Sequence, residues 1–249
     1  MPTESQAVLS RRSLPGSSVT TYHDRSSGCV FVVARPEDQW ELWNSYLDGA
    51  RTNYRKHGVE VVLEYDAIAD GRSTALFVVA LSADGTVVGG MRMQGRYDRP
   101  AQAHAVSEWA GRPGTAELLE EISQRLPEGV IEMKSGWVSD EAMRREQLTN
   151  ALARIFIHSM TLMKVRYVMG TVAAHAVKRW QTTGGVISSA VTPVAYPDER
   201  YRTVLMWWDR ETFADLTVAE QLPFVLEESA QIAQAWLPTP SIPGVVVCS

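Results

Sequence analysis

Two apolar runs joined by a turn sequence form the clearest local pattern in the chain. The runs at 74–81 and 86–93 contain many β-branched and large apolar residues and flank Asp84-Gly85. An Asp-Gly pair between two such runs is typical of a two-stranded β-hairpin. The second run contains Gly89-Gly90, and adjacent glycines in a strand indicate a bulge or the close approach of another backbone or a ligand. The pattern therefore predicts a hairpin with an irregular returning strand.

The rest of the chain alternates strand-like runs with segments of helical periodicity. Short apolar runs predict strands at 29–34, 130–138, 165–171 and 201–208. Apolar residues at helical spacing predict helices at 36–54, 116–126, 141–163 and 174–182, and two helical pieces in 211–236 separated at Pro223. Strands mixed with helices in this way indicate an α/β or α+β fold.

Composition divides the chain into three parts. Residues 1–27 are rich in Ser, Thr, Arg and Gly and are expected to form a flexible arm. Residues 28–210 are expected to form one domain, and 211–249 a helical extension and tail. Within the domain, residues 96–129 form a polar, Pro- and Gly-punctuated excursion, which is long for a loop and is a candidate lid.

Charge and cysteine content exclude several classes of function. The net charge of -5 over 249 residues argues against nucleic-acid binding, which normally needs a basic face. Two cysteines cannot form a disulfide framework, no apolar run approaches a membrane span, and the N-terminus has no signal-like apolar core. No histidine or cysteine spacing matches a metal site, and no P-loop or nucleophile elbow occurs. We expect a cytoplasmic protein without a metal.

A strand that leads into a helix carries the first candidate binding site. Arg144 and Arg145 lie early in the helix predicted to follow the strand at 130–138. Cations near a helix N-terminus oppose the macrodipole unless an anion, such as a phosphate, lies among the free N–H groups. Alternatively, Asp140, Glu141 and Glu146 neutralise the two arginines on a solvated face.

Three further side chains allow a functional and a structural interpretation. Glu132, on a predicted strand between apolar residues, is either a general base for an amine or an exposed group on a polar face. His175, at a predicted helix start, is either a proton shuttle or a cap. Trp43 belongs to an aromatic stripe on the first helix, which either packs in the core or lines an acyl-chain site.

The order of these segments resembles the GNAT acyltransferase superfamily, in particular the branch with the acyl-homoserine-lactone (autoinducer) synthases and the N-acyl amino acid synthases. The similarity spans about 40–208 and includes five segments: Leu63-Glu64-Tyr65-Asp66, the returning strand Val88-Gly89-Gly90-Met91-Arg92-Met93, the central strand with Glu132 and Trp137-Val138, the strand, helix and turn at 167–186, and the closing strand at 199–205.

The resemblance implies a fold and a set of residue roles. The fold is a twisted mixed β-sheet flanked by helices, with a V-shaped splay between central strands that admits a thioester donor. Backbone amides of Gly136, Trp137 and Val138 would hold the pantetheine arm and thioester carbonyl, and Arg144 and Arg145 would meet phosphate. Glu132 and Asp66 would orient or deprotonate the acceptor amine. Independently of the resemblance, Arg92, Trp43, Glu64 and His175 are candidate substrate-binding residues from their type and position.

The chain also differs from the superfamily pattern at specific positions. Gln147 and Thr149 stand where the phosphate loop normally carries glycines, and Ser135 stands where the autoinducer branch usually has arginine. Trp180 lies where the superfamily often places a tyrosine acid, and an indole cannot serve as that acid. Water, Tyr196 or Tyr201 would then protonate the leaving thiolate.

The sequence thus predicts a cytoplasmic acyltransferase that moves an acyl group from acyl-CoA or an acyl carrier protein to a primary amine of a small molecule such as an amino acid. The Trp-rich first helix and the long excursion favour a long acyl chain. Two alternatives stay open: an acetyl-CoA-dependent N-acetyltransferase, and a non-catalytic protein that binds an acyl thioester or a partner protein.

Overall fold

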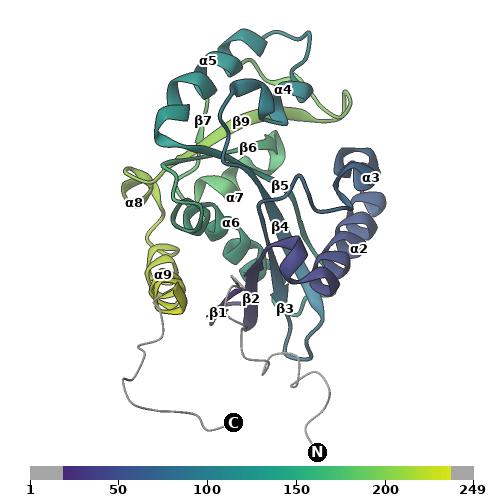
Figure 1. Cartoon of the computed structure of the whole chain (residues 1–249), viewed down its shortest axis with the longest axis vertical. Helices are drawn as coiled ribbons and strands as arrows, with labels where there is room; N and C mark the ends of the chain where they lie inside the picture. Colours follow the sequence, from purple (N-terminus) through teal and green to yellow (C-terminus); the bar gives the residue numbers. More distant parts are fainter. Residues whose placement is uncertain (1–18, 237–249) are drawn as a thin grey trace, which may run out of the picture.

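A nine-stranded mixed sheet forms the centre of the computed structural model, which describes residues 19–236 (Figure 1). The strand order is β1-β2-β3-β4-β5-β6-β9-β7, with β8 also paired to β9. The strands are β1 Thr20–Asp24, β2 Cys29–Ala34, β3 Leu76–Leu81, β4 Val87–Gly95, β5 Val130–Val138, β6 Tyr167–Ala173, β7 Val186–Ile187, β8 Val194–Ala195 and β9 Arg202–Asp209. Only β5 and β6 pair in parallel among the described strands.

Helices cover both faces of this sheet. The α-helices are α2 Trp40–Lys56, α3 Tyr65–Ile68, α4 Ala105–Glu108, α5 Thr115–Arg125, α6 Arg145–Leu162, α7 Val177–Gln181, α8 Phe213–Leu216 and α9 Leu222–Trp236. Short 3-10 turns are η1 Pro36–Asp38, η2 Glu60–Leu63, η3 Pro100–Gln102, η4 Leu126–Glu128 and η5 Ala174–Ala176. None of the described helices combines the length and apolar character needed to span a bilayer.

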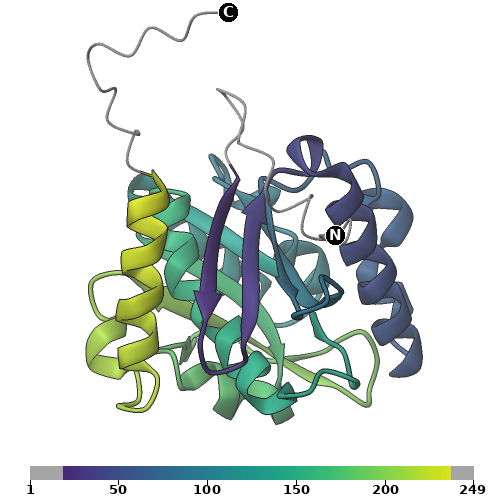
Figure 2. The same cartoon turned by 90° about the horizontal axis from the view of Figure 1, so that it is seen from below.

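Alternation of side chains along the strands assigns the helices to faces. Val78, Met91 and Met133 point to the face packed by α6, which also buries Ile232 of α9. Their neighbour Phe77 points to the opposite face, where α2 covers the β2–β4 half. The helices α4 and α5 cover the β6–β9 half of this opposite face. Figure 2 shows β1 and β2 between α9 on one side and α2 on the other.

The predicted hairpin is confirmed. β3 and β4 pair antiparallel around the turn at Asp84-Gly85, with a register shift at Ala80 and Leu81. Gly90 is needed for a close approach, because a Cβ there would lie 2.5 Å from the Val78 carbonyl oxygen and 2.9 Å from the Tyr46 ring. The irregular strand therefore accommodates α2 rather than a ligand at this point.

Two sequence predictions are corrected at element boundaries. Residues 20–27 are not a flexible arm, because β1 pairs with β2 from Thr20↔Val33 to Asp24↔Cys29; residues 1–18 lie outside the described part. The helix predicted from Glu141 begins four residues later at Arg145. Met143, which the predicted helix would have included, lies before its start and is 99% exposed. The strand β1 was missed because its buried and exposed side chains alternate over only five residues, and most of these residues are polar.

The excursion at 96–129 contains the predicted helix as α5. Trp109, Leu118 and Ile122 are fully buried from this segment, in a core with Met169 of β6 and Trp207 of β9. It is therefore a packed layer of the domain rather than a loose lid.

Buried hydrogen bonds and ion pairs connect the C-terminal helix α9 to α6 and to the edge strand β1. Arg154 of α6 donates to Glu228 of α9 at 2.7 and 3.0 Å and to Asp24 of β1 at 2.9 Å. His158 Nε2 lies 2.7 Å from Glu228 Oε2. Because the charges pair with one another inside the protein, removal of one partner would leave a buried charge uncompensated.

Candidate active site

The candidate active site is a cleft where β5 and β6 stop pairing. The two strands pair from Val130↔Tyr167 to Met133↔Gly170, and both continue beyond that point without a shared ladder. A cavity of about 500 Å³ occupies the gap. This divergence agrees with the V-shaped splay predicted between central strands.

The cleft has one apolar and one polar side, because it passes between the strands from one face of the sheet to the other. On the α6 face its wall is apolar and includes Met91, Met133, Phe156, Val172 and Trp180. On the opposite face it includes the polar side chains of Tyr54, Lys134, Thr171, Tyr196 and Thr203, together with the apolar Val59 and Val62 after α2. An amphipathic ligand fits such a cleft if its apolar chain lies toward α6 and its polar group toward α2 and α4.

The two predicted phosphate-binding arginines take different positions. Arg145, the first residue of α6, lines the cleft and pairs with Asp140 at 3.2 Å. Arg144 donates to the Ser26 carbonyl oxygen at 3.2 Å, on the β1–β2 turn, and does not line the cleft. Of these two arginines, Arg145 alone lines the cleft.

The backbone of β5 changes direction at the cleft. Ser135 has a positive φ of 54°, and the β4–β5 register shifts between Gly90 and Arg92. Gly136 lines the cleft, and its carbonyl oxygen accepts from Tyr54 Oη at 3.3 Å. The side chains of Trp137 and Val138 are buried, so that any contact of these two residues with a donor would come from their backbone.

Glu132 is fully buried and its carboxylate has many donors. Oε2 accepts from Tyr97 Oη at 3.0 Å and from the His104 backbone N–H at 2.8 Å, and Oε1 accepts from the Ala105 N–H at 3.1 Å. Glu132 thus binds the start of α4 to β5 and does not line the cleft. Its predicted role as a base is not supported by these contacts, which favour a positioning role.

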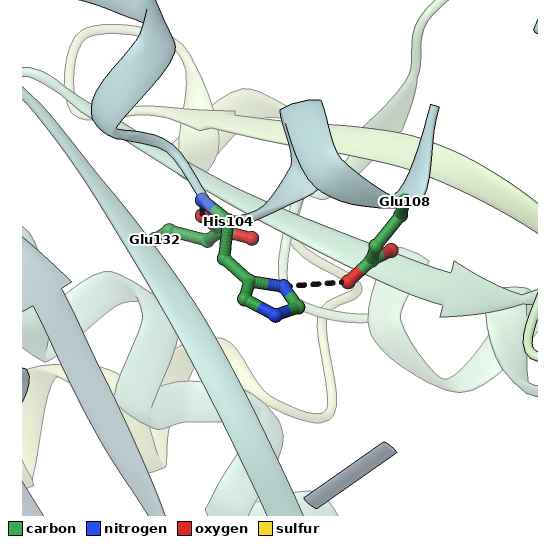
Figure 3. A group of neighbouring side chains, drawn as sticks. All are labelled: His104, Glu108 and Glu132. Carbon is green, nitrogen blue, oxygen red and sulfur yellow. Dashed lines mark hydrogen bonds and ion pairs between the residues drawn. The ribbon is translucent and has the colours of Figure 1, made fainter. Parts of the chain in front are cut away.

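Glu108 and Lys134 form a buried ion pair that sequence reasoning missed (Figure 3 shows Glu108 beside His104 and Glu132). Lys134 Nζ contacts Glu108 Oε1, and Thr171 Oγ1 donates to the same oxygen at 3.2 Å. Burial alone would raise the pKa of Glu108, but Lys134 and His104 lower it to about 2. Burial would lower the pKa of Lys134, yet the carboxylates of Glu108 and Glu132 keep it above its ordinary value.

His104 connects this cluster to predicted residue Glu64. Its Nδ1 lies 3.1 Å from Glu108 Oε1 and its Nε2 2.9 Å from Glu64 Oε2. His104, Glu108 and Glu132 are close enough to share a cation. Their donor set does not fit a metal ion, because Lys134 already places an ammonium between the two glutamates. Glu64 is 45% exposed, so the cluster reaches solvent on this side.

The remaining predicted site residues lie in three different places: in the core, on the surface and in the cleft wall. Arg92 is 2% exposed on β4, and Trp43 is fully buried with its Nε1 donating to the Ala69 carbonyl oxygen at 3.1 Å. The packing interpretation therefore applies to Trp43. Asp66 is exposed on α3 and lines neither of the two cavities described for residues 19–236.

His175 lies at the cleft wall on η5, directly after β6, as its position before a helix predicted. Both tyrosines proposed as substitute acids, Tyr196 and Tyr201, also line the cleft. Burial and the nearby Glu108 raise the pKa of Tyr196 to about 12. Tyr196 is therefore a neutral phenol at ordinary pH, which is the form able to donate a proton.

The splayed mixed sheet and the helix that begins at the cleft define a GNAT-like acyltransferase fold. FeeM, an N-acyl amino acid synthase from uncultured soil microbes, is similar with a TM-score of 0.57 and 11% identity, covering 78% of this chain and 97% of FeeM. An uncharacterised protein from Bacillus halodurans is similar with a TM-score of 0.51 and 8% identity, covering 84% of this chain and 97% of that one. At these identities the likeness concerns the fold.

The chain belongs to the same family as the uncharacterised proteins Mb1391c of Mycobacterium bovis and Rv1356c of Mycobacterium tuberculosis. It is 48% identical to each over 204 residues, which cover 82% of this chain and 78% of the mycobacterial proteins. No protein-family model matches the chain.

Proposed function

We propose that the protein transfers an acyl group from an acyl thioester, on CoA or an acyl carrier protein, to a primary amine of a small molecule such as an amino acid. The observation that carries the proposal is the two-sided character of the cleft between β5 and β6. Acyl transfer to an amine needs an apolar site for the chain and a polar site for the amine on either side of one carbonyl carbon. The cleft provides both within about 500 Å³.

The donor would enter at the α6 end. Arg145 and the N-terminus of α6 offer positive charge to a phosphate of the donor. Beyond Met133, β5 has no β6 partner. The backbone groups from Lys134 to Val138 that bond neither to β4 nor to the side chains of Tyr46, Asn53 and Tyr54 would therefore be available to the pantetheine arm and the thioester carbonyl. The acyl chain would then lie on the apolar side, against Phe156 and Trp180.

In the reaction the amine nitrogen bonds to the carbonyl carbon and the carbon–sulfur bond breaks. Of the three protons on the acceptor ammonium, one stays on the amide nitrogen, one ends on the thiol sulfur and one leaves to solvent. Tyr196, which lines the cleft, would donate a proton to the leaving thiolate and would recover its proton from the amine nitrogen. Glu132 would act through α4 and the charged cluster rather than on the amine itself, and exposed Asp66 has no assigned contact with the cleft.

One observation favours the non-catalytic alternative. The carboxylate of Glu132, the base candidate from the resemblance, already accepts hydrogen bonds from Tyr97, His104 and Ala105. A protein that only binds an acyl thioester would keep the cleft without needing a free base.

A thiol-release assay with acyl-CoAs from acetyl to palmitoyl, and the matching acyl carrier protein thioesters, against pooled primary amines tests the proposal. We expect release with at least one donor chain longer than acetyl, and a reduced kcat in Tyr196→Phe. Tyr167→Phe is the control, because Tyr167 is outside the cleft lining. If acetyl-CoA alone is used, the N-acetyltransferase alternative is correct. If no donor releases thiol but donors raise the Tm, the protein is a binding protein; if neither occurs, the acyl-thioester proposal is wrong.

A further inference from the structure

One face of α2 is bonded to the part of β5 that has lost its β6 partner. Positions 46, 53 and 54 of α2 share this face, because they follow the helical spacing i, i+7 and i+8. Three side chains of the face donate to three carbonyl oxygens of β5: Tyr46 Oη to Ser135 at 2.8 Å, Asn53 Nδ2 to Val138 at 3.0 Å, and Tyr54 Oη to Gly136 at 3.3 Å. The helix therefore contacts the backbone of β5 and not only its side chains.

A glycine within α2 brings the helix close to the same segment. Gly49 lies between Tyr46 and Asn53 on this face, and a Cβ at Gly49 would overlap the ring of Trp137. Glycine in the interior of a helix lowers its stability, so it is expected there only where something must approach the helix backbone. The Trp137 ring does so, and α2 thus packs along the whole segment 135–138.

This segment lies where the sheet no longer supplies partners on both sides. β5 pairs with β6 only as far as Met133↔Gly170. Backbone carbonyl groups that lose a strand partner need other donors, and α2 supplies three. Tyr46 is fully buried behind the segment, whereas Asn53 and Tyr54 line the cleft on the polar side. The helix on the polar side therefore takes the place of the missing strand.

A hydrogen bond to a carbonyl oxygen also sets the direction of the next N–H group. The Ser135-Gly136 peptide is trans, and the C=O and N–H of a trans peptide point in opposite directions. The bond from Tyr46 to the Ser135 carbonyl oxygen therefore directs the Gly136 N–H away from Tyr46. Ser135 has a φ of 54°, so the regular alternation of the strand is interrupted here. The direction of the Gly136 N–H in the cleft wall thus depends on Tyr46.

We propose that Tyr46, Asn53 and Tyr54 are positioning residues that hold the donor-binding backbone of β5, so that the Gly136 N–H meets the thioester carbonyl. This inference rests on the proposed function, in which this backbone receives the donor. A donor group fixed in advance stabilises the negative oxygen of the transition state without reorganisation during the reaction. The three side chains act through the strand, so the helix on the amine side of the cleft sets the geometry of the donor side.

Three variants each remove one donor of α2. They are Tyr46→Phe, Asn53→Ala and Tyr54→Phe. Ser45→Ala is the matched control, because Ser45 Oγ donates to the Glu41 carbonyl oxygen at 2.9 Å within α2 and not to β5. Because Asn53 and Tyr54 lie at the cleft wall, their variants keep the test available if Tyr46→Phe does not fold.

Hydrogen exchange on the full chain without any donor tests whether α2 holds the strand. We expect faster exchange of the backbone amides at 134–138 in Tyr46→Phe and Asn53→Ala than in the wild type, and no change in Ser45→Ala. Unchanged exchange in all three variants would overturn the proposal, whatever the activity of the protein.

Infrared spectroscopy tests whether the held strand positions the donor. The probe is the acyl-CoA, of the series from acetyl to palmitoyl, that binds the wild type most tightly, with an isotopically labelled carbonyl carbon and no amine present. A hydrogen bond to the thioester oxygen lowers its carbonyl frequency, and we expect this shift to shrink in Tyr46→Phe and Asn53→Ala and to persist in Ser45→Ala. With an amine present, kcat should fall about tenfold in Tyr46→Phe, with the KM for the amine unchanged.

The outcomes separate this inference from the proposed function. If the wild type releases thiol but the bound carbonyl has the wild-type frequency in all three variants, the side chains are only structural and the inference alone is wrong. A lower Tm in a variant does not rescue it, because a structural role would also lower the Tm. If no thioester binds the wild type, the proposed function and the donor-positioning role both fail, even where the variants exchange faster.

Discussion

His104 Nε2 lies 2.9 Å from Glu64 Oε2, and this contact joins the two helical covers on the polar face of the sheet. Glu64 precedes α3, on the side covered by α2, and His104 precedes α4 on the other side. Arg92 of β4 and Lys134 of β5 are cross-strand partners and lie between the half of the sheet that α2 covers and the half that α4 and α5 cover. Glu64 is 45% exposed, whereas Glu108 and Lys134 are buried, so the contact lies between solvent and the buried ion pair.

Loss of this contact should affect acceptor binding more than donor binding. Glu64→Gln removes the charge that faces His104 but leaves Glu108 in place, so we expect a several-fold higher KM for the amine with the KM for the thioester unchanged. Steady-state kinetics with each substrate varied in turn measures both. Glu60→Gln is a matched control, because Glu60 pairs with Arg51 and Arg55 instead of His104. Equal effects of the two substitutions would contradict a specific role of the Glu64–His104 contact.

The Glu108–Lys134 pair should make the fold sensitive to acid. The pKa of Glu108 is lowered to about 2 in the folded chain, below its unfolded value, so its stabilising effect is present above the unfolded pKa and is lost as pH falls toward 2. Urea unfolding from pH 7 to pH 3 should show this loss, and Glu108→Gln should flatten the dependence. An unchanged slope in Glu108→Gln would assign the acid sensitivity to other carboxylates.

Removal of Lys134 should be costly for stability. Lys134→Met leaves Glu108 and Glu132 buried without their shared cation, and we expect a loss of about 3–5 kcal/mol in the free energy of unfolding. Chemical denaturation at pH 7 measures this loss. The double variant Lys134→Met/Glu108→Gln should recover part of it, because one of the uncompensated charges is gone. No recovery would mean that the loss comes from packing.

Gly90 should not tolerate a methyl group. A Cβ at Gly90 would lie 2.5 Å from a backbone carbonyl oxygen, whereas the nearest atom to a Cβ at Gly136 is the end of the Met91 side chain at 3.5 Å. We expect Gly90→Ala to destabilise the fold by about 1–3 kcal/mol, as overpacking does, and Gly136→Ala to change stability much less. Thermal unfolding of the two variants under identical conditions measures this difference, and we expect the lower Tm for Gly90→Ala. Similar Tm values would show that α2 can move away from the strand.

Most of the strands could be predicted because each consists of a continuous run of apolar residues. The Asp-Gly hairpin and the apolar run of β5 are readable from neighbouring residues, and β5 has the predicted bounds. The start of α6 was not predicted, since Ser139 and Asp140 are good cap residues while no side chain caps the helix at Arg144. Sequence shows which residues can cap a helix and does not show where tertiary packing makes the helix begin.

The candidate site was predictable only in part, for a related reason. Gly136, Arg145 and His175 line the cleft: Gly136 lies within the strand predicted at 130–138, Arg145 follows that strand, and His175 follows the strand predicted at 165–171. Glu108 was missed because it lies in the four-residue helix α4, which is too short to show helical periodicity in the polar excursion. Its partner Lys134 is 26 residues away, so the pair exists only after the excursion packs on the sheet.

The divergence of β5 and β6 has a consequence for how the donor site changes during evolution. Past Met133 and Gly170 the facing edges of the two strands no longer bond to each other across the space between them. A pantetheine arm, which contains two amide units, would fill that space as an inserted strand and would be recognised through main-chain groups. Such recognition places little demand on side-chain identity. Substitutions that preserve the divergence of the two strands could therefore change the acceptor while the mode of donor binding stays the same.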